Sequence, residues 1–142
     1  MASLTLIYED DALRIYWNEE YGYYLSDWQY VFRKGDDLRR SYQACIDAAK
    51  ARRGAPWLID SSKLSVVDLT DVKWIEEWFW PEFIAAGATQ AAVIPPQKAV
   101  SKLSASRSSK KAIEQGGFQA TVHANRSDAE AALLELCAKA DD

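Results

Sequence analysis

The chain has 142 residues, of which 49% are hydrophobic and 27% charged, and its formal net charge at pH 7 is −4. This length and composition predict one globular domain, residues 1–142, with a real hydrophobic core, and they exclude a disordered chain. The acidic balance argues against a nucleic-acid-binding surface. The first residues lack a basic region before a long apolar run, and no stretch has the length of a membrane helix. We therefore expect a cytoplasmic protein without membrane insertion.

Three strand-like segments open the chain, separated by short polar turns. Residues 4–8 are apolar, Leu13, Ile15 and Trp17 alternate with more polar neighbours, and residues 21–28 are rich in aromatic side chains. Alternation and aromatic enrichment are typical of half-buried strands. Three such strands with short turns predict an antiparallel meander.

The first helix is predicted to begin at Gly35, with acidic residues in its first turn, and to end at a basic segment closed by Gly54. The basic residues Arg52 and Arg53 at this end are interpreted as partners of a helix dipole rather than as an anion site. The positions predicted to be buried fall on one face of the helix: Leu38, Tyr42, Cys45, Ile46 and Ala49.

A short apolar run from Trp57 to Ile59 follows, and Asp60 ends it. Such a run is typical of a strand that is covered on both faces, as in a parallel sheet. Asp60, Ser61 and Ser62 then lie at the carboxyl end of this strand, which is the end where open α/β sheets bind ligands. This edge of the sheet is our candidate functional edge.

The next helix is predicted to begin at Thr70 and to end at Gly87. We expect the Thr70 hydroxyl to accept a hydrogen bond from the first turn, where Asp71 also suits the positive end of the helix. Pro81 removes a backbone donor, so the helix should kink or restart near Trp80.

Two stripes of side chains run along this predicted helix. Trp74 and Trp78 form one of them, at i, i+4 spacing. If Trp78 and Trp80 are not both buried, they form an exposed aromatic patch, and we then expect a homodimer through this helix or the loop after it. The other stripe is apolar and predicted to be buried: Val72, Ile75, Phe79 and Phe83.

The order of these features resembles the STAS-like, or SpoIIAA-like, proteins: a strand ends in Asp60, a loop carries Asp68, and a helix begins at Thr70. The run VVDLTDVKWI, with the Trp, Pro and Gly that follow it, is similar to that of the uncharacterised bacterial STAS/SEC14-type proteins. The resemblance covers Leu13 to Leu136 as an order of elements, and it is sharpest from Leu58 to Gly87.

The resemblance implies a bacterial regulatory or protein-interaction module rather than an enzyme. In the anti-sigma-factor antagonists of this family, the serine before the glycine of an Asp-Ser-Ser-Gly element is phosphorylated, and the matching position here is Thr70. The sequence departs from that element, because it reads Asp68-Leu69-Thr70-Asp71. The lipid-binding SEC14-type domains imply an alternative, a small-molecule or lipid binder with a pocket lined by Trp74, Trp78 and Trp80.

The C-terminal part of the chain predicts two further strands and a last helix. Residues 91–94 predict a second buried parallel strand, and residues 118–123 alternate as a final strand. Between them, residues 97–113 are basic, and a solvated helix face or a loop is favoured over an anion-binding patch. Ser127 and Glu130 match a capping box at the start of the last helix. The buried face of this helix is predicted to hold Ala131, Leu134 and Cys137, with Leu133 beside them.

No catalytic or metal-binding signature stands out in the sequence. His123 is the single histidine, and a lone histidine without neighbouring Cys or His lacks the spacing of metal ligands. A catalytic dyad with a serine or threonine is recognised by geometry and not by composition. We therefore predict no catalytic residue, no metal and no cofactor. Free buried thiols at Cys45 and Cys137 are favoured over a disulfide.

Asp60, Ser61, Asp68 and Thr70 form the strongest polar constellation, and we expect them to meet at one edge of the sheet. Capping of loops and helix ends by these residues is favoured over phosphorylation of Thr70. A phosphate at a helix start is nevertheless electrostatically tolerated.

Together these patterns predict an α/β domain, in which an antiparallel meander runs into βαβ units to form one mixed sheet of about six strands covered by helices. The predicted function is a non-enzymatic STAS-like module that binds another protein or itself. A small-molecule binder is the alternative, and an enzyme that uses Asp60 or His123 is the least favoured reading.

Overall fold

The structure is a computed structural model that describes residues 4–29, 34–63, 69–95 and 118–141. The predicted features at Asp68 and at residues 97–113, and the side chain of Cys137, lie outside this described part. Within it, no helix has both the length and the apolarity needed to span a membrane.

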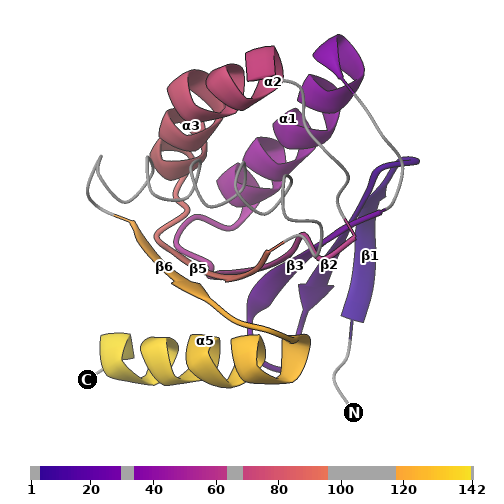
Figure 1. Cartoon of the computed structure of the whole chain (residues 1–142). Coiled ribbons are helices and arrows are strands. Elements are labelled where there is room, and N and C mark those ends of the chain that lie inside the picture. Colours follow the sequence, from indigo (N-terminus) through magenta and orange to yellow (C-terminus); the bar gives the residue numbers. More distant parts are fainter. Residues whose placement is uncertain (1–3, 30–33, 64–68, 96–117, 142) are drawn as a thin grey trace.

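A six-stranded mixed sheet forms the centre of the domain, which confirms the predicted fold class. Its strands follow one another in space in the order of the sequence (Figure 1). The first three pair antiparallel as the predicted meander, and from the third onwards all neighbours pair parallel. The strands are β1 (Leu4–Glu9), β2 (Leu13–Asn18), β3 (Tyr23–Trp28), β4 (Trp57–Asp60), β5 (Gln90–Ile94) and β6 (Gln119–Val122).

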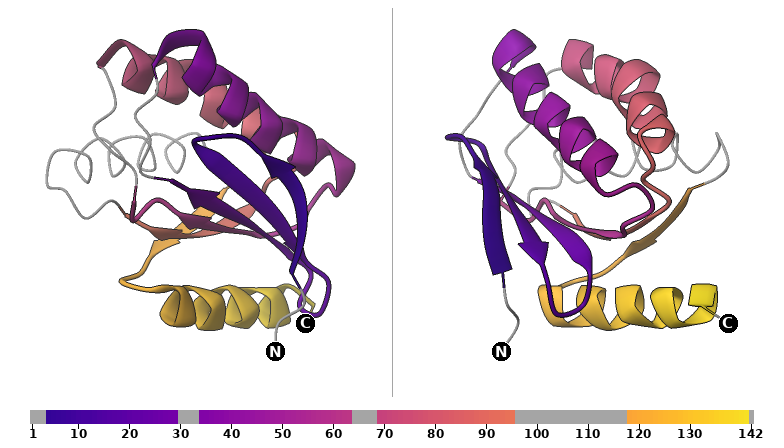
Figure 2. Two further views of the ribbon diagram at one scale, coloured as in Figure 1. Left: turned by 90° about the vertical axis from the view of Figure 1, so that its right-hand side faces the viewer. Right: turned by 180° about the vertical axis from the view of Figure 1, so that it is seen from behind.

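Helices cover both faces of this sheet. One face carries α1 (Gly35–Ala51) and a second helix made of α2 (Leu69–Trp74), the π-helical turn η1 (Ile75–Phe79) and α3 (Trp80–Ala85). The other face carries α5 (Arg126–Asp141), as Figures 1 and 2 show from three sides. The domain therefore has three layers, with the sheet in the middle.

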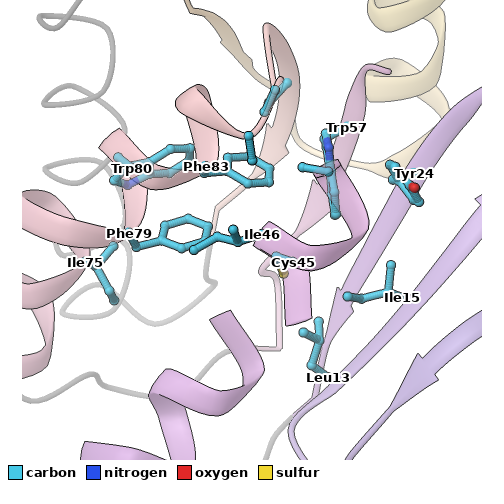
Figure 3. Packing of buried hydrophobic residues seen from close by; sticks show 14 of the residues in the cluster. Leu13, Ile15, Tyr24, Cys45, Ile46, Trp57, Ile75, Phe79, Trp80 and Phe83 are labelled. Atoms are coloured by element: carbon cyan, nitrogen blue, oxygen red, sulfur yellow. The ribbon is translucent and has the colours of Figure 1, made fainter. Parts of the chain in front are cut away.

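The larger hydrophobic core lies between the sheet and the layer of α1, α2 and α3 (Figure 3). Trp57 is its centre, because its ring stacks on Tyr24 at 4.5 Å between centroids and meets the edge of Phe83 at 5.0 Å. The predicted stripe of Val72, Ile75, Phe79 and Phe83 is buried in this core, so that prediction is confirmed.

A smaller core lies under α5 and holds Leu25, Leu58, Ala92 and Ile94 of the sheet. Trp57 and Leu58 point into different cores, which confirms that β4 is covered on both faces. The alanines of β5 let α5 come close, since Ala92 packs with Ala129 and Leu133 of that helix.

The start of the second helix differs from the prediction. α2 begins at Leu69, so Thr70 is already inside the helix and is not its N-cap. Asp71 has a role that sequence spacing does not show. It is buried, and both its carboxylate oxygens accept from the backbone N–H of Gly35 at 3.2 Å, where α1 begins. The first turn of one helix therefore caps the start of the other.

The predicted restart near Trp80 is confirmed, because α3 begins at Trp80 directly after the π turn. The backbone N–H of Trp80 donates to the carbonyl of Ile75, five residues earlier, which is the bond of a π turn. The wider turn lets the proline follow without a clash against the carbonyl four residues before it. Gly87 ends the helix at a φ of 115°, where a Cβ atom would lie 2.9 Å from the Cα of Arg53.

The predicted start and face of the last helix are wrong. α5 begins at Arg126, and the Asn125 side chain caps it by accepting from the backbone N–H of Asp128 at 2.9 Å. Asn125 caps the helix because it directly precedes the first helical residue, whereas Ser127 already lies inside the helix. Ala129 and Leu133 are buried against the sheet, one helical turn apart on the same face of α5. The predicted Ala131 lies on another face and is exposed.

Candidate functional site

Two aspartates lie at the carboxyl ends of neighbouring parallel strands. Asp27 of β3 and Asp60 of β4 are partners in the strand register. Both are almost fully buried, at 6% and 5% exposure. Side chains two residues apart on a strand share a face, and Leu25 and Leu58 pack under α5. The two carboxylates therefore lie on the α5 side of the sheet.

Arg126, the first residue of α5, bridges these two carboxylates. Its Nε donates to Oδ2 of Asp60 at 2.7 Å, and its Nη2 lies 3.0 Å from Oδ1 of Asp27. The second contact is an ion pair without hydrogen-bond alignment, since this Oδ1 has no hydrogen-bond partner among the described residues. Lys63 adds a longer contact, with its Nζ 3.9 Å from the same oxygen.

Asp60 also organises the residues that follow it. Its Oδ1 accepts from the backbone N–H of Ser62 at 3.0 Å and from the Ser62 hydroxyl at 2.6 Å. Burial by itself raises the pKa of Asp60, but the hydrogen bonds from Ser62 and Arg126 outweigh burial and hold this pKa below its usual range. Ser61 is buried and its N–H donates to the carbonyl of Ile94 at 2.9 Å, which ties β4 to the end of β5.

We call Asp27, Asp60, Ser62, Lys63 and Arg126 the carboxylate edge. Its two negative and two positive groups already face one another, and Arg126 carries the link to α5. Within the described part of the chain, no group of three or more Asp, Glu, His or Cys side chains is placed to hold a metal ion. What this arrangement does chemically is to fasten α5 to the sheet.

The predicted constellation is only partly brought together. Asp60, Ser61 and Ser62 meet at the carboxylate edge, but Thr70 does not join them. The helix that carries Thr70 belongs to the layer on the opposite face of the sheet from α5 (Figure 1). Thr70 is exposed near the start of that helix.

The outer side of the helix from Leu69 to Ala85 carries a second group of residues. Trp74 and Trp78 stack with 4.8 Å between ring centroids and 24° between planes, and Trp78 is 37% exposed. The guanidinium carbon of Arg39, on α1, lies 5.1 Å from the Trp74 ring centroid. Thr70 precedes Trp74 by one turn of helix. We call Thr70, Lys73, Trp74, Glu77 and Trp78 the tryptophan surface.

Trp80 does not belong to the tryptophan surface. It is 6% exposed, and its ring lies 5.4 Å from that of Phe118 and 5.8 Å from that of Phe83 in the larger core. Its position two residues after Trp78 turns it towards the opposite side of the helix. The three tryptophans therefore do not line one pocket. Trp74 and Trp78 stack against each other, whereas Trp80 packs in the larger core.

Two other polar groups have local partners. Nε2 of His123 lies 2.7 Å from the hydroxyl oxygen of Thr121. Asp10 accepts from the hydroxyl groups of Tyr8 at 2.6 Å and Ser41 at 2.7 Å, which ties the turn after β1 to α1. Burial, and then this bond to Asp10, raise the pKa of Tyr8 to about 12.

An open hollow of about 220 Å³ lies beside Asp10, and it is lined by Asp10, Asp11, Asp37, Arg40 and Ser41. The carboxylate of Asp10 is fully engaged, because it also accepts from the backbone N–H groups of Ala12 and Leu13. These bonds give Asp10 the role of closing the turn.

Asp27 and Arg126 are the functional-edge residues that sequence reasoning missed. A signal for Asp27 was present, since it is the penultimate residue of β3 and Asp60 is the last residue of β4, and parallel neighbours place such residues side by side. Arg126 gives no such signal, because its role depends on where α5 crosses the sheet.

A comparison of this chain with protein-family models, curated proteins and solved structures finds no match.

Proposed function

We propose that this protein is a non-enzymatic STAS-like module that binds another protein chain through the tryptophan surface. The observation that carries the proposal is the stacked pair of Trp74 and Trp78 on the outer side of the helical layer. Tryptophan combines a large apolar ring with a polar N–H, and it is enriched at protein interfaces. The neighbouring guanidinium of Arg39 gives the same surface a cation, and arginine is enriched there too.

The proposal includes Thr70 as the phosphoacceptor that controls this surface. Thr70 is exposed in the first turn of its helix, where the positive end of the helix dipole favours a phosphate. Trp74 lies one turn further along the same side. A phosphate at Thr70 therefore changes the charge beside the tryptophans without a need for refolding.

The carboxylate edge supports a structural role for the polar residues of the sheet. Asp60 and Ser62 are bonded to each other, and Arg126 neutralises Asp60 from α5. These contacts anchor α5 to the sheet edge. The binding surface that we propose is therefore the tryptophan surface, on the layer at the opposite face of the sheet.

The test is mass spectrometry of the protein purified from the organism that encodes it. We expect an added mass of about 80 Da, one phosphoryl group, that maps to Thr70. It should disappear in Thr70→Ala and persist in Thr89→Ala, which removes another exposed threonine hydroxyl. An unmodified Thr70, or a phosphate at another residue only, overturns the assignment of Thr70.

Native mass spectrometry of the same sample separates this module from the small-molecule binder. A binding module is expected to show the mass of the polypeptide and its phosphate. A ligand that is retained under native conditions and released on denaturation contradicts the module and favours the tryptophan-lined binder.

A further inference from the structure

The charges along the tryptophan surface have a fixed order. Lys73 lies one residue before Trp74, and Glu77 lies one residue before Trp78, so the two charges flank the tryptophans on the same side of the helix. Glu82 follows one turn later. Lys73, Glu77 and Glu82 are all exposed. The first half of this surface is thus positive and the second half negative.

Lys73 and Glu77 make no ion pair within the part of the chain that the structure describes. Both charges are therefore available to another molecule. A partner that satisfies both has to present an acid opposite Lys73 and a base opposite Glu77, at the same spacing of one helical turn and on either side of an apolar centre.

We infer that this partner is a second copy of the chain, bound antiparallel through the same helix; the inference rests on the proposed role of the tryptophan surface. A two-fold axis between Trp74 and Trp78 brings Lys73 of each copy to within two residues, about 3 Å along the helix, of the level of Glu77 of the other, which the lysine side chain can span. It also packs the tryptophan pairs of the two copies together. A parallel arrangement sets Lys73 level with Lys73 and Glu77 level with Glu77, on opposite sides of the seam, so it pairs neither charge with its opposite. A two-fold contact is isologous, so assembly stops at the dimer.

The size of this contact predicts a reversible dimer. At 1.5 Å per residue, the helix from Leu69 to Ala85 is about 25 Å long. One helix of this length, with the side chain of Arg39 beside it, offers less than the roughly 800 Å² per partner of a standard stable interface. We therefore expect a weak dimer whose population changes with concentration over the micromolar range.

The same geometry gives Thr70 a defined effect on the dimer. Thr70 lies four residues before Trp74, and Glu82 lies four residues after Trp78. The two-fold axis consequently sets Thr70 of one copy opposite Glu82 of the other. A phosphate at Thr70 faces a carboxylate twice in each dimer, so phosphorylation dissociates it.

Sedimentation equilibrium from about 1 to about 200 µM tests the dimer, because this range brackets a micromolar dissociation constant. We expect Trp78→Ala to weaken self-association at least about tenfold. Tyr21→Ala is the matched control, since Tyr21 is an aromatic residue of similar exposure, 44% against 37%, and lies outside the tryptophan surface. An unphosphorylated protein that stays monomeric over the whole range, or equal effects of both variants, overturns the inference.

Charge reversal tests the antiparallel order with variants that leave the core intact. Lys73→Glu and Glu77→Lys are each expected to weaken the dimer, and the double variant is expected to restore it. A double variant that associates no better than either single one contradicts the arrangement. Thr70→Glu should weaken the dimer, and Thr70→Glu with Glu82→Gln should recover part of the loss. If Thr70 is phosphorylated in the cell but the unphosphorylated protein is also monomeric, the dimer is overturned alone, and the proposed module binds another partner.

Discussion

Replacing Arg126 by methionine removes the guanidinium that holds α5 to the sheet and keeps an apolar stem of similar length. In the native protein this group lies 2.7 Å from Asp60 and 3.0 Å from Asp27, whose side chains are 7% and 9% exposed. The substitution leaves two buried carboxylates side by side on neighbouring strands. Lys63, at 3.9 Å from Asp27, remains as the nearest cation.

The cost follows from charge and exposure. Unit charges 4 Å apart attract by about 4 kcal/mol at an effective dielectric constant of about 20. Renewed hydration offsets part of this loss, and breaking a fully buried pair costs about 3 to 5 kcal/mol. The Arg126 side chain is 46% exposed, so solvent screening lowers the figure. Removal of a cation from the first turn of α5 returns roughly 0.5 kcal/mol. We expect Arg126→Met to lower the free energy of unfolding by about 2 kcal/mol.

Urea unfolding followed by tryptophan fluorescence measures this difference, and the chain offers a closely matched control. Arg14 has the same side-chain exposure, 46%, and also donates from Nε to a carboxylate, but its partner Glu9 is 51% exposed. Arg14→Met is expected to lower the free energy of unfolding much less than Arg126→Met does, because exposed ion pairs contribute little to stability. The reasoning is refuted if both arginine variants cost the same.

The effect of pH gives an independent check of the cause. Because the folded protein holds the pKa of Asp60 below its usual value, Asp60 stabilises the native protein above pH about 4, and this contribution is lost as the pH falls through the folded pKa. In Arg126→Met, Asp60 loses its cation, so the pKa of Asp60 rises above its value in the native protein, and the variant loses less stability than the native protein does as the pH falls. The deficit relative to the native protein should be smaller at about pH 4 than at pH 7. A deficit that is unchanged between these pH values argues against a charge origin.

Three further outcomes are expected. Gly87→Ala should lower the free energy of unfolding in urea by about 2 kcal/mol, because alanine at a φ of 115° is strained and its Cβ meets the backbone of Arg53; a loss below about 0.5 kcal/mol contradicts this. Asn125→Ala should cost about 1 kcal/mol in the same assay, whereas Ser127→Ala should cost much less, and the reverse order would restore the capping box as the helix start. Because burial raises the pKa of the Cys45 thiol, iodoacetamide at pH 8 should label it only on unfolding, and peptide mapping that finds rapid labelling of the folded protein rules out its burial.

The order of the secondary-structure elements was predictable because it follows from local patterns. Alternation in the first 28 residues predicts a meander, and the apolar run that begins at Trp57 predicts a strand covered on both faces. The stripe through Val72 and Phe83 predicts which side of a helix is buried. Each of these signals repeats with the period of its own element, so no knowledge of distant residues is needed.

Helix ends were less predictable, because several residues compete to cap the same turn. Ser127 with Glu130 has the spacing of a capping box, yet Asn125 accepts the bond and Glu130 instead accepts from the hydroxyl of Tyr23. Asp71 suits the start of its own helix by charge, but it caps α1 through Gly35. In both cases a residue distant in the sequence decides which local option is used. Tyr23 lies more than a hundred residues from Glu130, and Gly35 lies some tens of residues from Asp71.

Local patterns in the sequence are enough to predict which segments become strands and helices, that the sheet is mixed, and that polar residues end β4. Which of those polar residues meet depends on how the strands and helices pack. The register of two parallel strands places Asp27 beside Asp60, and the crossing of α5 brings Arg126 to both. The same layering puts Thr70 on the opposite side of the sheet, with the tryptophans. A buried charge needs a partner that is close in space, and a local sequence pattern does not show where along the chain that partner lies.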